Sequence, residues 1–275
     1  MTDSRTLPTL GRHNPHLLRL RRIVQRQEAD LTVAEGLKLT ADLAAAGTPI
    51  VELFTIPDRL PEVLGSRELS KVCNEGRAYL VEPATASGIA PTQQTQGVIA
   101  VVPVPAVRLR AEGIVVYLDR VQDPGNVGSV VRCAAAFGAS GVACSPGCAD
   151  PFSPRAVRAS AGNALLLPVQ AAAAFGPLAE EARRAGGEVA ATSGRGGIAP
   201  GRWRPRRPLV LALGNEGQGL SDEILAVCRR TVTIPLSEGV ESLNVAVTAG
   251  ILLASLAGVA GPPILGLQGR EGRPR

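Results

Sequence analysis

Histidine, lysine and aromatic residues are scarce in this 275-residue sequence. Both histidines, His13 and His16, lie near the N-terminus, so the rest of the chain has no histidine for acid–base catalysis or metal binding. The five cysteines are scattered and include no C-x-x-C pair. We therefore expect buried, reduced thiols and no metal site.

Long apolar runs are also missing. No run reaches the ~18 residues that a membrane-spanning helix needs. The segment 245–261 comes closest, and a buried helix explains it. The N-terminus lacks the apolar core of a secretion signal. We expect a cytoplasmic protein without a membrane segment.

The two common phosphate-binding glycine motifs are absent as well. The stretch DPGNVGSVVRCAAAFG (123–138) follows a predicted strand, GIVVYL (113–118), where a nucleotide-binding loop would lie. Its glycines, at 125, 128 and 138, fit neither G-x-G-x-x-G nor the P-loop pattern. The sequence therefore lacks the glycine motif that a dinucleotide-dependent oxidoreductase would have.

The basic residues are almost all arginine: of 29, only Lys38 and Lys71 are lysine, and the net charge is +5. A GC-rich genome would explain this arginine bias as well as a function would. The clustering of basic residues is therefore better evidence for an anionic partner than their total number. The basic residues of the predicted helix around 17–29 either bind RNA phosphates or form a solvated face. The cluster GRWRPRRP (201–208) either binds RNA, with Trp203 stacking on a base, or is a connecting loop with Trp203 packed onto the domain.

The order of predicted elements indicates two units. Residues 1–105 form a small α/β unit, and the proline-containing segment 103–113 is the boundary. The second unit covers residues 106–275, and from 113 on its strands and helices alternate, with a short strand expected at 164–169 and a disordered tail from about 266. Such alternation predicts an α/β fold with a mainly parallel sheet, whose ligands bind beyond the carboxyl ends of the strands.

Three loops follow strands of the second unit: LDRVQDPGNVGSVVRCAAAFGASGV (118–142), LALGNEGQGLSDEIL (211–225) and IPLSEGVESLNVAVTAGILLA (234–254). In this order they resemble the signature motifs of the SpoU/TrmH family of RNA 2′-O-ribose methyltransferases, which have the trefoil-knotted SPOUT fold. The resemblance covers residues 113–261, including RASAGNALLLPV (158–169). The N-terminal unit resembles the L30e-like substrate-binding domain of many family members.

The resemblance implies S-adenosylmethionine (AdoMet) as the cofactor, bound in a bent shape by backbone groups at the knot. AdoMet has no phosphate, which accounts for the missing phosphate loops. The cofactor-binding residues that the resemblance implies are Thr192, Gly194, Gly214, Ile234 and Leu243.

Four residues of the motifs are implied in catalysis: Asn126, Arg132, Glu216 and Asn244. Arg132 matches an arginine that is proposed to be catalytic in the family, perhaps as a base. We prefer a role for Arg132 as a phosphate anchor, because a guanidinium group almost never loses its proton. Gly128 and Ser129 would let backbone approach RNA closely. Asn244 would also cap the last helix. The residues expected to contact RNA are Arg19, Arg21, Arg22, Arg26 and Ser242.

The resemblance also implies a homodimer formed through the knotted domain. The implied function is RNA 2′-O-methylation, with ribosomal RNA favoured over transfer RNA. A catalytically silent RNA-binding member of the fold is the alternative from another class. The sequence does not identify the target nucleotide, and it does not separate a housekeeping enzyme from an antibiotic-resistance enzyme.

Overall fold

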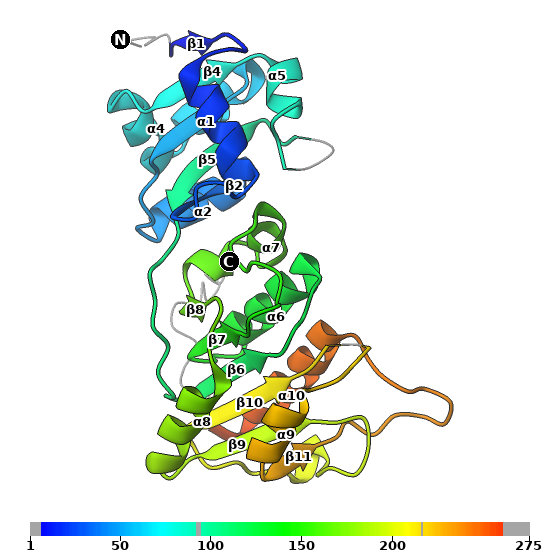
Figure 1. The fold of residues 1–275 in the computed structure, drawn as a ribbon. Helices are drawn as coiled ribbons and strands as arrows, with labels where there is room; N and C mark the ends of the chain where they lie inside the picture. The colour runs from blue at the N-terminus through cyan, green and yellow to red at the C-terminus, as the bar shows by residue number, and fades with distance from the viewer. Residues whose placement is uncertain (1–6, 92–94, 216, 261–275) are drawn as a thin grey trace, which may run out of the picture.

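The computed structural model describes residues 7–91, 95–215 and 217–260. Two α/β units follow one another along the chain, and a long connection joins them (Figure 1). The predicted boundary at 105/106 falls in this connection, between strands β5 and β6. The expected disordered tail from about 266 lies outside the described residues.

The first unit contains the five-stranded sheet A, in the order β1-β4-β3-β5-β2. Strands β2 and β3 pair antiparallel with β5, and the other pairs are parallel. The elements are β1 (Thr9–Leu10), α1 (Pro15–Val24), β2 (Leu31–Glu35), α2 (Leu37–Ala45), β3 (Glu52–Thr55), η1 (Pro57–Arg59), α3 (Leu60–Gly65), α4 (Arg67–Asn74), β4 (Ala78–Val81), α5 (Pro83–Ser87) and β5 (Val98–Pro103).

Helices cover both faces of sheet A because alternate strand residues are apolar on each side. Ile99 and Val101 of β5 pack in one apolar cluster with residues of α1 and α5. Val98 and Ala100 pack in another with residues of α2 and α4. Helix α1 therefore lies on the opposite face of the sheet from α2 and α4.

The second unit contains the six-stranded sheet B, in the order β11-β9-β10-β6-β7-β8, with every pair parallel. The mainly parallel sheet predicted from the sequence is confirmed. The elements are β6 (Ile114–Leu118), α6 (Pro124–Ala136), β7 (Gly141–Cys144), α7 (Pro154–Ala159), η2 (Asn163–Leu165), β8 (Val169–Gln170), α8 (Phe175–Arg184), β9 (Glu188–Thr192), η3 (Pro200–Arg202), β10 (Leu209–Leu213), α9 (Asp222–Val227), β11 (Arg230–Val232) and α10 (Val245–Ala260).

The central strands β6 and β10 are buried along their whole length, which is why their sequences are continuous apolar runs. Residues 114, 116 and 118 pack in one cluster with residues of α6 and α10. Residues 115 and 117 pack in another with residues of α8 and α9. The strand expected at 164–169 is wrong in most of its length: residues 163–165 form η2, and β8 begins only at Val169.

The two units touch where β2 meets α7 and the segment before it, and where α2 lies against Gly162 after α7 (Figure 1). The Thr32 hydroxyl donates to the Phe152 carbonyl at 2.6 Å in a buried position. Arg26 donates to the Asp150 carboxylate at 2.6 Å, and Arg158 lies 3.8 Å from the carboxylate of Glu35. These contacts hold the first unit against α7 and the residues just before it.

Across the described ranges, every helix is too short or too polar to cross a bilayer.

Candidate active site

A pocket of about 350 Å³ opens beyond the carboxyl ends of β9, β10 and β11. Thr192, Leu213 and Val232, the last residues of these strands, all line it. The other walls come from the loop after β10 and from residues 234–252. This is the edge of a parallel sheet at which ligands are expected to bind.

The five residues predicted to bind the cofactor come from three separate segments of the chain, and all of them line this pocket: Thr192, Gly194, Gly214, Ile234 and Leu243. Ser242, predicted to contact RNA, lines it as well and is exposed. The structure thus brings together residues that are up to 51 positions apart (192 to 243) in the sequence. The roles of these residues in binding remain predictions.

Gly214 is required by the tight loop that forms one wall of the pocket. Asn215 and Gly219 exchange two backbone hydrogen bonds, of 3.1 and 2.8 Å, which closes the loop on itself. A Cβ at Gly214 would lie 2.3 Å from the Gly219 carbonyl carbon and 2.5 Å from the Leu220 nitrogen. Any larger residue would push the loop away from β10.

The pocket is largely apolar, with one described carboxylate, Glu241, and no arginine or lysine among its described lining residues. Phosphates are bound in proteins by basic side chains or by open helix N-termini, and this lining offers no basic side chain. The lining suits a ligand with an apolar ring, hydroxyl groups and positive charge.

Asn126 and Asn244 contact each other beside this pocket. The Asn244 amide donates to Asn126 Oδ1 at 2.9 Å. Its own oxygen accepts from the Ala246 backbone N–H at 2.8 Å and from that of Val247 at 3.4 Å, so Asn244 caps α10 as predicted. Asn244 directly follows Leu243, a pocket residue, so the pair lies beside the pocket.

Arg132 does not join this contact. It is exposed on α6, and it makes no ion pair or side-chain hydrogen bond with another described residue. Asn126 already lies inside α6, so the two residues are six helical positions apart. At about 100° and 1.5 Å per residue, their side chains point about 120° apart, with Cα atoms about 9 Å apart along the axis.

Two further expectations about the motifs have different outcomes. Glu216 lies outside the described residues. Gly128 does not provide an open approach to RNA, because it is buried against α7. A Cβ there would lie 2.4 Å from the Ala156 carbonyl oxygen and 2.7 Å from Ala159 Cβ, so this glycine allows α6 and α7 to pack closely.

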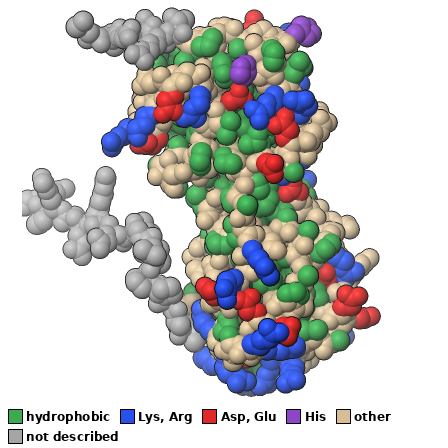
Figure 2. Space-filling model, turned by 60° about the vertical axis from the view of Figure 1, so that its left-hand side comes forward, with side chains coloured by type: hydrophobic (Ala, Val, Ile, Leu, Met, Phe, Trp, Pro, Cys, Tyr) green, Lys and Arg blue, Asp and Glu red, His purple; other side chains and the backbone are tan. Residues whose placement is uncertain are grey.

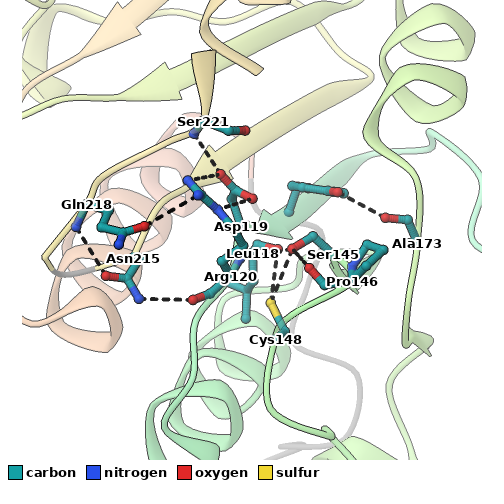
Figure 3. A network of polar contacts seen from close by, with 11 residues as sticks. Leu118, Asp119, Arg120, Ser145, Pro146, Cys148, Ala173, Asn215, Gln218 and Ser221 are labelled. Carbon is teal, nitrogen blue, oxygen red and sulfur yellow. Dashed lines mark hydrogen bonds and ion pairs between the residues drawn. The ribbon is translucent and has the colours of Figure 1, made fainter. Parts of the chain in front are cut away.

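A polar network missed by the sequence analysis joins the first and second loops (Figure 3). Asp119 follows β6, is almost fully buried, and accepts from the Ser221 backbone N–H at 2.8 Å. The Arg120 guanidinium lies 3.3 Å from its carboxylate, and Asn215 donates to the Arg120 carbonyl at 3.0 Å. A carboxylate placed directly after a buried strand was the signal available in the sequence.

The arginines predicted to contact RNA on α1 and after it have unequal surroundings. Arg19 and Arg22 lie 3.1 and 3.3 Å from the Glu28 carboxylate and remain partly exposed. Arg21 is half-buried without a described acidic partner. Arg26 is only 19% exposed and ties the first unit to Asp150. Its geometry suits a structural tie, in contrast to that of Arg19, Arg21 and Arg22.

Trp203 does not stack on a base, because it is buried with 4% exposure. Its indole N–H donates to the Glu188 carboxylate at 2.9 Å. The packed tryptophan of the alternative is confirmed. The arginines around it are exposed, so the aromatic half of that hypothesis is wrong and the electrostatic half remains open.

The cysteines are all free, but only Cys144 is buried. A hydrogen bond from the Cys144 thiol lowers the pKa of Cys148 to about 6, and burial raises the pKa of Cys228 to about 11. In the part of the chain that the structure describes, no group of three or more His, Cys, Asp or Glu is placed to hold a metal ion.

Comparisons with known proteins agree on one family. Residues 113–254 match the model of the SpoU rRNA Methylase family. An uncharacterized tRNA/rRNA methyltransferase of Synechocystis is 38% identical over 184 residues, which are 64% of this chain and 65% of that protein. The 23S rRNA (uridine(2479)-2′-O)-methyltransferase of Streptomyces viridochromogenes is 35% identical over 57% of this chain and 58% of its own.

A solved structure also matches. The AdoMet-bound rRNA methyltransferase of Sinorhizobium meliloti is 30% identical and superposes with a TM-score of 0.75 over 88% of this chain and 94% of its own. The alignments with the two curated relatives thus span less than two thirds of those proteins, whereas the structural match extends over both units.

Proposed function

Because this chain belongs to the SpoU rRNA Methylase family, we propose that it is an AdoMet-dependent RNA 2′-O-ribose methyltransferase that acts on ribosomal RNA. One observation carries the proposal: the Asn126–Asn244 pair lies directly beside a pocket that is lined by all five predicted cofactor residues. The proposed reaction also places the protein in the cytoplasm, where ribosomal RNA is found.

The pocket supports AdoMet as the cofactor. AdoMet has an adenine ring, ribose hydroxyls and a positively charged sulfonium, and no phosphate. Leu213, Ile234 and Leu243 offer apolar surface to a ring, and Glu241 offers the only described carboxylate of the lining to a cation. When bound, AdoMet would supply an activated methyl group.

The residues of this chain would then bind and orient the RNA. Arg132, exposed and without a described acidic partner, is suited to hold the phosphate beside the target ribose through both arms of its guanidinium. The Asn126–Asn244 pair would position the 2′-OH. The hydroxyl proton would leave to the phosphate or to water, since a guanidinium with a pKa above ~12 is not a base at neutral pH.

A homodimer would complete this site. Arg132 points about 120° away from Asn126 around α6, so both side chains of one helix cannot easily reach one ribose. The neighbouring helix α10 exposes Val247 and Ile251, at 50% and 39%, one turn apart. A second copy packed on these helices would cover the apolar stripe and bring its own Arg132 to the partner's pocket.

Sedimentation tests the dimer. Ile251→Glu should convert the protein to a monomer and abolish methyl transfer. Leu166→Glu, at an exposed leucine just after η2, should sediment as the wild type does. A wild-type monomer that is fully active would rule out a shared site.

Transfer of labelled methyl from AdoMet tests the function. We expect label in unmodified 23S rRNA transcribed in vitro and little in unmodified transfer RNA. Label in transfer RNA alone would make the enzyme a tRNA methyltransferase. AdoMet binding without transfer to either RNA would favour a silent RNA-binding member of the fold. AdoMet should raise the melting temperature and NAD should not.

A further inference from the structure

Basic side chains gather at one end of the second unit, away from the first unit (Figure 2). We call this region the basic end and define it by six exposed arginines: Arg202, Arg204, Arg206, Arg207, Arg229 and Arg230. We propose that the basic end binds the phosphate backbone of a double-helical segment of the RNA substrate, at a distance from the methylation site. This inference rests on the proposed function.

The topology brings these arginines together. Arg229 and Arg230 lie at the start of β11, and β11 pairs with β9 so that Arg230 is opposite Ala190. The loop before β10 is fixed to the start of β9 because Glu188 accepts from the Trp203 indole. All six arginines therefore lie near the amino ends of β9, β10 and β11, and the pocket lies at the carboxyl ends.

The charge of the basic end is not balanced by nearby carboxylates. No ion pair joins any of the six arginines to an acidic residue among those the structure describes. Glu188 lies close by and accepts from the Trp203 indole N–H and the Arg206 backbone N–H, so its single negative charge faces six guanidinium groups. Most other described arginines are paired, as Arg77 is with Glu75 and Arg155 with Asp123. Genome composition explains many arginines, but it does not explain why six arginines without a described ion pair lie together at this end.

Clustered guanidinium groups repel one another and are suited to bind phosphate with both arms. This end has an arginine-rich loop and strand edge and no exposed aromatic side chain, because Trp203 is buried. Single-stranded RNA is usually bound by stacking its bases on aromatic rings. Double-helical RNA is recognised through its shape and phosphates. The composition of the basic end therefore favours a duplex.

The test compares a variant in which four arginines of the basic end are replaced by glutamine with a control that loses the same number of charges elsewhere. R202Q/R206Q/R207Q/R230Q removes four charges and leaves Arg204, whose guanidinium donates to the carbonyls of Gly201 and Trp203 and helps to hold the loop. R59Q/R67Q/R77Q/R108Q removes the same charge from exposed or largely exposed sites on the first unit and the connection. Unchanged AdoMet binding shows that both variants are folded.

Binding to a mixed-sequence RNA duplex and to single-stranded oligo(U) is measured over a range of salt concentrations. The basic-end variant should lose tenfold or more in duplex affinity. Its salt slope should fall by up to about 0.9 for each lost phosphate contact. Oligo(U) binding and the control variant should change little. Equal salt slopes for wild type and basic-end variant, or equal losses in both variants, would overturn the proposal.

Methyl transfer to 23S rRNA separates this proposal from the proposed function. The basic-end variant should raise KM for the RNA and leave kcat unchanged. Suppose that the wild type transfers methyl and that the variant has the same KM and duplex affinity. Then only the proposal that the basic end binds RNA is refuted, and an acidic protein becomes the better partner for this surface. If the wild type transfers no methyl, the proposed function fails, and the duplex measurements still decide the role of the basic end.

Discussion

Asn244 makes two contacts through the two ends of one amide. Its oxygen caps α10, and its nitrogen donates to Asn126 at 2.9 Å. Stability and activity can therefore be separated at this residue. Asn244→Ser should keep the cap and lose the contact with Asn126, so methyl transfer should fall while the melting temperature stays nearly constant.

Asn244→Ala serves as the comparison. It should lose both contacts, and its free energy of unfolding should fall by about 1 kcal/mol for the missing cap. Chemical denaturation and the transfer assay measure the two effects. Full activity in Asn244→Ser would show that the amide contact does not position the ribose.

Arg132 is exposed and has no described acidic partner, so its replacement should not destabilise the fold. Arg132→Lys keeps the charge and loses the two-armed geometry. If the guanidinium positions the phosphate, kcat/KM should fall on the order of a hundredfold, with AdoMet binding unchanged. Turnover close to that of the wild type would contradict the role of phosphate anchor.

At the scale of elements, close packing of helices depends on single glycines. Gly128→Ala should force α6 away from α7, because the added methyl group would lie 2.4 Å from the Ala156 carbonyl oxygen. We expect a loss of about 1–3 kcal/mol in the free energy of unfolding. Gly65→Ala, in open space at the end of α3, should change stability by less than about 1 kcal/mol. Equal effects in the two variants would refute this reading of Gly128.

The elements that the sequence predicts well are those whose burial forces a simple pattern. Strands β6 and β10 are buried on both faces, so their sequences are unbroken apolar runs. The segment 164–169 is also rich in apolar residues, yet it begins in η2 and joins a strand only at Val169, with Leu165 buried and Leu166 exposed. Apolar character alone does not separate a short buried strand from a buried loop.

The residues of the candidate site also divide into those that the sequence predicts and those that it does not. The motif residues of the pocket were identifiable through family resemblance, because each lies in a recognisable loop after a strand. The position of Asp119 after a strand is visible in the sequence, but its partner Ser221 lies 102 residues away, and no local pattern reveals that contact. Trp203 was ambiguous because only its burial decides between a base-stacking ring and a packed one.

At the scale of the whole molecule, the contact between the units depends on a few polar groups. Thr32→Val removes the buried 2.6 Å hydrogen bond to the Phe152 carbonyl. The carbonyl would then lack this donor, so the free energy of unfolding should fall by about 1–3 kcal/mol. Calorimetry should show the transitions of the two units moving apart.

Thr40→Val is the matched control. The Thr40 hydroxyl is buried and has no hydrogen-bond partner among the described residues. Its removal should leave stability unchanged or raise it by about 1 kcal/mol. If Thr32→Val and Thr40→Val have the same effect, the Thr32–Phe152 contact does not hold the units together.

The knot and the L30e-like character of the first unit are whole-molecule predictions from the resemblance, and they stay predictions. The confirmed part is the parallel α/β architecture and the family. The central claim is that this chain methylates the ribose of RNA. That claim requires a cofactor pocket beside the residues that hold the ribose. The structure has a pocket at the carboxyl ends of β9, β10 and β11, next to Asn126 and Asn244.

The most direct test of that claim is the chemical identity of the product. Labelled 23S rRNA from the methyl transfer reaction is hydrolysed in alkali, which cleaves next to every free 2′-OH. We predict label in alkali-resistant dinucleotides with the wild type and none with Arg132→Ala. Label that appears only in mononucleotides would mean methylation of a base, and would contradict the assignment of this site to the ribose.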